Sequence, residues 1–229
     1  MAIETFYPFA EVEPRWQAAW EQRRLWKAPN PDSGKAFERK FYVLEQFPYP
    51  SGNLHMGHVR VYTIGDAVAR LRRMQGYQVL HPMGWDSFGL PAENAAIKNQ
   101  TQPRDWTDKC IATMKAQFMR LGISYDWDRE LSTCHETYYK WNQWLFIKMW
   151  EAGLAERRSA AVNWCPKCAT VLANEQVING RCWRHEDTEV EIRQLAQWFL
   201  KITDYAEELL RDLDDKLAEW PNLDRKSVV

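Results

Sequence analysis

Residues 47–58 of this chain read FPYPSGNLHMGH, in which two histidines, His55 and His58, stand three positions apart. A short apolar run at 41–44 precedes this stretch, and an apolar pattern of helical period follows it. The two prolines of the stretch prevent regular strand pairing from continuing, so we expect a strand, then a loop, then a helix. Loops of this kind, at the ends of strands in open α/β sheets, bind ligands.

The residues after His58 predict an amphipathic helix that ends near Gly76, followed by a second short strand over 77–80. Four apolar residues recur at helical spacing in this helix, namely Val61, Ile64, Val68 and Leu71. With the first strand expected at 41–47, the order strand, helix, strand is typical of a βαβ unit. The fold class is therefore predicted to be α/β, with a Rossmann-like parallel sheet whose ligand loops share one edge.

Further helices are expected on both sides of this unit, because apolar residues recur there at helical spacing. They cover 11–26, 91–99, 103–121, 136–153 and 194–217. Residues 30–34 form a turn-rich linker, and residues 163–189 interrupt the helical trend and contain most of the cysteines.

Composition restricts the class of protein. The chain has 229 residues, with 30 Lys and Arg against 31 Asp and Glu, so its net charge gives no overall attraction to nucleic acid. No segment reads as a signal peptide or a membrane span. The odd number of cysteines, five, fits a reduced, cytosolic compartment better than a disulfide framework.

The two histidines have the chemistry of a phosphate site. Gly57 lacks a Cβ, so the backbone between them can lie against a flat base or a phosphate. The start of the following helix offers free N–H groups, and imidazole N–H groups can donate to phosphate oxygens during displacement. The alternative is a chance motif in which one histidine simply caps the helix.

Asp86 follows the second strand, in the segment GWDSFGLP at 84–91. Its carboxylate would face the same crevice as the histidines and could bind an ammonium group. The alternative is that Asp86 is the N-cap of the next helix.

Cys165 and Cys168 form a C-x-x-C pair, and Cys182 and His185 form a C-x-x-H pair, separated by a stretch that suits a hairpin. Three thiolates and one imidazole satisfy tetrahedral zinc, and a site closed by four protein ligands indicates a structural ion. Scattered free cysteines are the competing interpretation.

Thirteen tryptophans invite a nucleic-acid stacking role, but most lie at helical spacing among apolar neighbours, which favours core packing for the majority. Trp164 and Trp183 are expected to cover the zinc module. Cys110 and Cys134 have no partner in the pattern and are expected to be packed core thiols.

Four segments together match a known family: residues 47–58, 84–93, 162–176 and 197–203. In their order and spacing the chain resembles the N-terminal part of the bacterial-type leucyl-tRNA synthetases, which are class I aminoacyl-tRNA synthetases. The resemblance covers the chain from the first helix to about Trp220. The form DSFGLPAE at 86–93 points to leucine, because the related isoleucine and valine enzymes usually carry a histidine at the third position of this segment.

The resemblance implies roles for individual residues. His55 and His58 would hold ATP phosphates and stabilise the transition state as the leucine carboxylate attacks the α-phosphorus, and magnesium would accompany ATP. The other implied site residues are Gly57 beneath the adenine, Asp86 at the substrate ammonium group, Phe47 and Tyr49 in the leucine pocket, Glu93 near the nucleotide, and Cys165, Cys168, Cys182 and His185 around zinc.

The resemblance also implies a division of the chain. Residues 1–155 would form the N-terminal half of a Rossmann-like catalytic domain. Residues 156–192 would be an inserted zinc module, and residues 193–229 a helical segment that leads towards an editing domain. The end of the chain, 222–229, departs from the family pattern.

The expected function is a leucine–tRNA ligase in the cytoplasm, with leucine, ATP and tRNA(Leu) as ligands and no membrane association. The lysine-containing K-M-S-K-S-type loop, the editing region and the anticodon-binding region of the family do not occur in these 229 residues. We therefore expect a fragment that needs a complementary C-terminal portion for full activity and for most contacts with tRNA. The alternatives are a non-catalytic, zinc-containing binding module and, less favoured, a small H-x-G-H nucleotidyltransferase.

Overall fold

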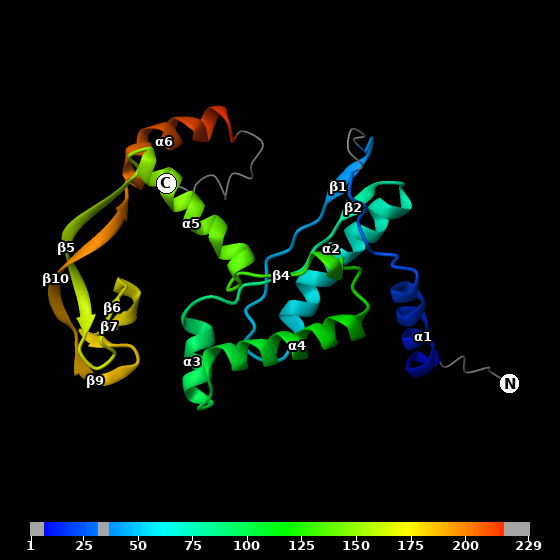
Figure 1. The fold of residues 1–229 in the computed structure, drawn as a ribbon, viewed down its shortest axis with the longest axis horizontal. Helices are drawn as coiled ribbons and strands as arrows, with labels where there is room; N and C mark the ends of the chain where they lie inside the picture. The colour runs from blue at the N-terminus through cyan, green and yellow to red at the C-terminus, as the bar shows by residue number, and fades with distance from the viewer. Residues whose placement is uncertain (1–6, 32–36, 218–229) are drawn as a thin grey trace. The chain divides into compact units, whose positions relative to one another are not determined.

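The computed structural model describes residues 7–31 and 37–217 of the chain (Figure 1). They belong to two compact units, Met1–Lys140 and Trp141–Val229. The long helix α5 (Glu136–Glu151) begins in the first unit and continues in the second. Part of the linker expected at 30–34, and the divergent end at 222–229, lie outside the described residues.

The first unit contains short strands and long helices. Its elements are α1 (Phe9–Gln22), β1 (Lys40–Tyr42), α2 (Met56–Met74), β2 (Gln78–Leu80), β3 (Gly84–Trp85), α3 (Leu90–Lys98), α4 (Pro103–Leu121), the 3₁₀ turn η1 (Trp127–Arg129) and β4 (Leu131–Ser132). The helices expected at 91–99 and 103–121 are confirmed within one residue.

The βαβ unit is confirmed. Strands β1 and β2 are parallel, with Lys40 opposite Gln78 and Tyr42 opposite Leu80, and α2 connects them. The first strand is shorter than the predicted 41–47, because regular pairing stops once the chain approaches the two prolines. Strands β3 and β4 form a second parallel pair. The loop predicted directly after the second strand therefore contains a further short strand, β3, and Asp86 follows β3 rather than β2.

Two apolar clusters hold the first unit together. The larger one joins α2, α4 and the segments around β3, and consists of Tyr62, Met83, Trp85, Met114, Phe118, Ile123 and Tyr125. The smaller one fixes α2 against the strands through Val43, Ala69 and Val79. The larger cluster also packs against Leu54 of the 47–58 stretch and so supports the histidine loop.

The apolar side of α2 is exposed, contrary to the usual expectation for an amphipathic helix. Its four periodic apolar residues are 47%, 61%, 38% and 52% exposed: Val61, Ile64, Val68 and Leu71. The polar side faces inward because it bonds to the loop after α4. Asp66 accepts the N–H of Ser124 at 2.7 Å, Arg73 donates to Ser124 Oγ at 2.9 Å, and Arg70 donates to the carbonyl of Gly122.

The second unit is built on a long antiparallel ribbon (Figure 1). The elements that follow α5 are β5 (Ala155–Cys165), β6 (Thr170–Leu172), the 3₁₀ turn η2 (Asn174–Gln176), β7 (Val177–Ile178), β8 (Arg181–Cys182), β9 (His185–Glu189), β10 (Glu191–Leu200), the 3₁₀ turn η3 (Ile202–Tyr205) and α6 (Ala206–Asp215). The ribbon consists of β5 and β10. Strand β10 runs along β5, with Glu191 opposite Trp164 and Leu200 opposite Ala155. The hairpin expected between the metal pairs is present as β7 and β8.

The helix predicted over 194–217 is wrong in its first half, and so is the helical description of residues 193–200. These residues form β10, whose burial alternates with period two, and the helix begins only at Ala206. The spacing of Trp198, Ile202 and Tyr205 fits a helix, but pairing with β5 satisfies the backbone of Trp198 in a strand instead.

The prediction that core packing explains most tryptophans is also wrong for this chain. Trp220 lies outside the described residues, and six of the other twelve are exposed. Trp164 and Trp183 stack with arginines rather than joining the apolar residues around the cysteines. Of the two unpaired cysteines, Cys110 is buried as predicted, whereas Cys134 is half-buried.

No helix among the described residues is long and apolar enough to cross a membrane.

Candidate functional site

The two histidines lie together at the start of α2. His55 is the N-cap of this helix, and its ring stacks on that of His58 with 3.8 Å between centroids. The first turn contains no acidic residue, so the partial positive charge of the helix start is not compensated there. The loop and helix thus place two imidazoles beside the free backbone N–H groups of a helix terminus.

Hydrogen bonds fix the tautomers of both rings. The N–H of Gly57 donates to His55 Nδ1 at 3.1 Å, and the N–H of His55 donates to His58 Nδ1 at 3.2 Å. A ring nitrogen that accepts a bond carries no proton, so in each neutral ring the proton is on Nε2. The capping role that competed with a phosphate site is therefore correct, and it leaves two Nε2–H donors available.

Electrostatics keeps His58 neutral. Burial and the neighbouring ring of His55 lower the pKa of His58 below its ordinary value. The uncharged form with its proton on Nε2 is thus the form that prevails at neutral pH.

Gly57 is required by the ring of His55. A Cβ at this position would lie 2.9 Å from Cε1 and 3.0 Å from Nδ1 of His55. The absence of a side chain at Gly57 thus serves packing within the motif itself, in addition to the open approach for a base that the sequence predicts.

Asp86 lies directly after β3, and its backbone joins it to the histidine loop. Its N–H donates to the carbonyl of Pro48 at 3.0 Å. The alternative N-cap role is wrong, since α3 begins at Leu90 and its N-cap is Gly89. Asp86 is half-buried, which leaves its carboxylate at the edge of the loop pair.

Phe47 packs across the same pair of loops. A Cβ on Gly84 would lie 2.4 Å from Cε2 and Cζ of Phe47, so the ring rests directly on the backbone at Gly84. Phe47 is half-buried, while Tyr49 is exposed. The fold therefore brings Phe47 and Asp86 together at the two loops.

Glu93 lies elsewhere in the first unit. It is exposed in the first turn of α3 and lines a cavity of about 530 Å³. The other lining residues include Ser87, Phe88, Arg104, Asp108 and His135, and neither Asp86 nor the motif histidines line this cavity. The structure does not bring Glu93 into contact with the histidine pair.

Gln117 of α4 binds the histidine loop, a contact that the sequence analysis did not predict. Its Oε1 accepts the N–H of Leu54 at 2.8 Å, and its Nε2 donates to Asn53 Oδ1 at 3.0 Å. A glutamine in the middle of a helix has no distinctive pattern, so only the folded arrangement identifies this contact.

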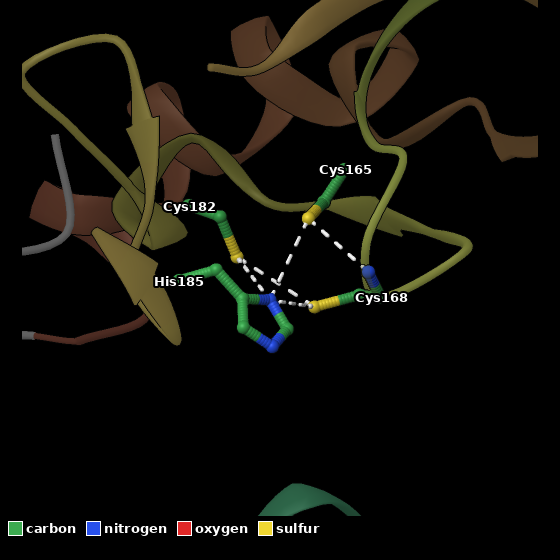
Figure 2. A group of neighbouring side chains, drawn as sticks. All are labelled: Cys165, Cys168, Cys182 and His185. Carbon is green, nitrogen blue, oxygen red and sulfur yellow. Dashed lines mark hydrogen bonds between the residues drawn. The ribbon is translucent and has the colours of Figure 1, made fainter. Parts of the chain in front are cut away.

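A second candidate site joins four ligand-type side chains in the second unit (Figure 2). Their ligand atoms, three Sγ atoms and one imidazole nitrogen, all lie within 4.8 Å of one another. These side chains belong to Cys165, Cys168, Cys182 and His185. The turn after β5 and the hairpin before β9 bring them together as the spacing predicts.

The distances within this cluster fit one tetrahedral ion. Cys168 Sγ lies 3.6 Å from Cys182 Sγ, and His185 Nδ1 lies 3.2 to 3.9 Å from the three sulfurs. Bond lengths of about 2.3 Å to sulfur and 2.0 Å to nitrogen would separate tetrahedral ligands by about 3.5–3.8 Å. Three thiols and one imidazole gathered in this way could hold one metal ion.

The cluster favours a thiolate at Cys165. Burial opposes ionisation, but the backbone N–H of Cys168, at 3.3 Å, and the neighbouring side chains lower the pKa of Cys165 to about 6. Burial and the adjacent thiols raise the pKa of Cys168 to about 11. Thiols crowded in this way hold full negative charge only with a cation among them.

The family follows from comparison with known proteins. The family model described as tRNA synthetases class I (I, L, M and V) matches residues 15–228. The chain belongs to this family. The class I synthetase fold that the family implies agrees with the βαβ unit and its ligand loops.

Curated relatives are leucine–tRNA ligases. The protein of Solibacter usitatus (strain Ellin6076) is 59% identical over 215 residues, which is 94% of this chain and 26% of that protein. The protein of Thermotoga maritima is 58% identical over 211 residues, which is 92% of this chain and 25% of that protein. The class I chain therefore spans about a quarter of the length of these relatives.

Solved structures agree. The ternary complex of Agrobacterium radiobacter K84 agnB2 LeuRS with tRNA and LeuAMS matches with a TM-score of 0.81 and 46% identity, over 96% of this chain and 27% of that one. A methionyl-tRNA synthetase of Mycobacterium tuberculosis, in complex with methionyl-adenylate, matches with a TM-score of 0.64 over 83% of this chain and 38% of that one. At 21% identity the second likeness supports the class I fold alone.

Proposed function

We propose that this chain forms the leucine- and ATP-binding part of a leucine–tRNA ligase. The reaction is activation of leucine by ATP to leucyl-adenylate, followed by transfer to tRNA(Leu). The observation that carries the proposal is the pair of imidazoles at the start of α2, whose Nε2 atoms are both free of capping bonds. The high identity to leucine–tRNA ligases supports leucine as the amino acid.

The histidines act on the phosphates. During activation an oxygen of the leucine carboxylate attacks the α-phosphorus, and the bond to pyrophosphate breaks. Negative charge grows on the phosphate oxygens as this happens, and preorganised N–H donors stabilise it. The Nε2–H groups of His55 and His58 and the backbone N–H groups of the α2 start supply such donors, and Gly57 lies under the adenine.

The amino-acid half is assigned to the paired loops. Asp86 binds the leucine ammonium group through its carboxylate, while Phe47 and Tyr49 line the pocket for the leucine side chain. Glu93 is assigned to the nucleotide side of the site in the complete enzyme. In this chain it lines a cavity that His55, His58 and Asp86 do not line. Magnesium accompanies ATP as its counter-ion.

The cysteine–histidine cluster is proposed to bind one structural zinc ion through Cys165, Cys168, Cys182 and His185. All four positions of a tetrahedral ion are then filled by protein, which leaves none for a substrate or water. Zinc would hold the turn after β5 to the β7–β8 hairpin. The proposed division into residues 1–155, 156–192 and 193–229 gives this module its own segment.

Further parts of a class I enzyme are needed for the whole reaction. The lysine of a K-M-S-K-S-type loop, which completes the phosphate clamp, is not among the 229 residues. We therefore propose that leucine activation at full rate, and most contacts with tRNA(Leu), require the complementary portion found in the longer relatives. The compartment proposed for this enzyme is the cytoplasm, where tRNA is charged.

Leucine-dependent exchange of pyrophosphate into ATP tests the proposal. The chain alone should show little exchange, and mixing it with the complementary portion of a relative should restore leucine-dependent exchange. Methionine in place of leucine is the matched control. Binding of leucine and ATP without exchange in the mixture would favour a non-catalytic binding module instead.

A further inference from the structure

A buried acid–base pair lies directly behind the two ligand loops. His81 is 0% exposed and its Nε2 lies 2.9 Å and 3.1 Å from the two carboxylate oxygens of Glu45. The side chain of Glu45 is 8% exposed. Neither residue belongs to the sequence motifs described above, and neither can reach a substrate from this buried position.

The hydrogen bonds of His81 require a proton between the two partners. Nδ1 of His81 lies 3.1 Å from the carbonyl oxygen of Ser124, which can only accept, so Nδ1 carries a proton. If Nε2 carried none, its lone pair would face a carboxylate in a site with little water. One proton therefore lies between His81 Nε2 and Glu45, as an imidazolium with a carboxylate or as a neutral pair.

Three titratable neighbours among the described residues, Tyr62, Tyr125 and Asp66, do not compete for this proton. Burial and the nearby charge of Glu45 raise the pKa values of Tyr62 and Tyr125, so both hydroxyls stay protonated. The carboxylate of Asp66 is already used by Ser124 and Arg70. The pair is thus a stable hydrogen-bonded connection.

This connection is the deepest of three between the two ligand loops. Glu45 lies two residues before Phe47, and His81 lies three residues before Gly84. Nearer the site, the ring of Phe47 rests on Gly84, and the carbonyl of Pro48 accepts the N–H of Asp86. Moving the Glu45–His81 pair would shift both loops at their base.

The structure also makes room for this pair in α2. A Cβ on Gly65 would lie 1.6 Å from Oε1 of Glu45, so any side chain at this helix position would displace the carboxylate. The helix that begins at the histidines is therefore in direct contact with the pair.

We propose that Glu45 and His81 are positioning residues. They hold the histidine loop (47–58) and the loop that contains Asp86 (84–91) at the separation that a leucyl-adenylate requires. The inference rests on the function proposed above. A ligand that spans both loops gains affinity from their fixed separation. The adenylate analogue spans them, and so does leucinol through Asp86 and the Phe47 pocket, whereas ATP alone contacts only the histidine loop. Loss of the pair should thus weaken the analogue and leucinol far more than ATP.

Calorimetry with three probes tests this on the natural chain and its variants: the sulfamoyl analogue of leucyl-adenylate, leucinol, and ATP with magnesium. Glu45→Ala should weaken the analogue and leucinol by about tenfold or more, and ATP with magnesium by less than about threefold. Glu45→Gln should restore most of the affinity, since its amide N–H can donate to a neutral Nε2 of His81. Val79→Ala is the matched control, because it removes buried contacts of β2 and leaves the pair intact.

The outcomes separate the two claims. If the natural chain does not bind the analogue, the proposed function fails and this inference fails with it. If the natural chain binds and Glu45→Ala binds equally well, or if Val79→Ala weakens the analogue as much at equal loss of melting temperature, only the positioning role is overturned. Should Glu45→Ala not fold, Gly65→Ala displaces the carboxylate with both partners retained, and the same pattern across the three probes is expected.

The ¹⁵N spectrum of His81 gives an independent readout. In the natural chain Nδ1 should carry a proton, and the Nε2 signal should reflect the proton shared with Glu45, on either partner; in Glu45→Gln, Nε2 should accept the amide N–H without a proton of its own. An Nε2 signal that Glu45→Ala leaves unchanged would overturn the shared proton on which the connection depends.

Discussion

His55 and His58 show that capping and catalysis need not compete. Each ring uses Nδ1 to satisfy a backbone N–H of the helix start, which orients the ring and fixes its proton on Nε2. A buffer-exposed histidine without this bond would exchange between tautomers. The residues that begin the helix are thus the same residues that are proposed to contact the phosphates.

The titration of His58 is predicted to be abnormal. Because burial and His55 disfavour its charged form, its pKa should lie below 6.5 in an NMR titration. A lowered folded-state pKa means that protonation opposes folding, so this contribution to stability is complete above pH 6.5 and is lost as the pH falls through the lowered value. His55→Asn should raise the pKa of His58 in part, since burial remains.

An unchanged or raised pKa of His58 in the natural chain would contradict this account of the pair. Addition of pyrophosphate should raise the pKa of His58, because a bound anion favours the imidazolium form.

Gly84 is predicted to control the leucine half of the site. Gly84→Ala would place a Cβ 2.4 Å from the Phe47 ring and push that ring out of position. We expect the affinity for leucinol to fall by about tenfold, or about 1.4 kcal/mol. Gly52→Ala in the histidine loop is the control, since a Cβ there meets nothing within 4 Å. Equal affinities of the two variants would refute the role of Phe47.

At the level of elements, the zinc module gives the sharpest prediction. Purified chain should contain about one zinc per molecule by metal analysis, and Cys182→Ser should lower that content. Cys134→Ser is the matched control, because Cys134 lies in the first unit and outside the cluster. A zinc content that Cys182→Ser leaves unchanged would remove Cys182 from the ligand set.

Elements with strong local signals could be predicted from the sequence, and elements defined by pairing could not. Helix α4 begins at Pro103 and ends before Gly122, whose φ of 72° suits glycine, and both signals are local. The residues 194–200 carry apolar side chains compatible with either a helix or a strand. Only their pairing with β5, more than thirty residues earlier, decides for a strand.

The candidate site divides in the same way. The motif residues His55, His58 and Asp86 could be found from spacing and chemistry. Glu45, His81 and Gln117 could not, because their function depends on contacts between segments that lie 36 to 64 residues apart.

At the scale of the whole chain, the two units are predicted to depend on metal separately. A chelator should increase hydrogen exchange in β5–β9. This segment has only a small buried apolar cluster, so bound zinc would supply much of its stability. Exchange in α2 and α4 should stay unchanged, since their buried cluster contains none of the four ligands. Uniform loss of protection in both units would show that the metal stabilises the chain as one cooperative body.

Exposed apolar residues are the main feature that composition did not predict. Trp141, Trp144 and Trp150 of α5 are each more than half exposed, as are Ile64 and Leu71 of α2. A periodic pattern shows that a helix has an apolar side, but it does not show what covers that side.

The most direct test of the central claim is calorimetry of the leucyl-adenylate sulfamoyl analogue with the natural chain and with His58→Asn. Asparagine can still accept the capping N–H but lacks a donor at the position of Nε2. The account predicts saturable one-to-one binding by the natural chain, and binding weakened by about tenfold or more in the variant at unchanged helical content. Equal affinity of the two proteins, or no binding by the natural chain, would contradict it.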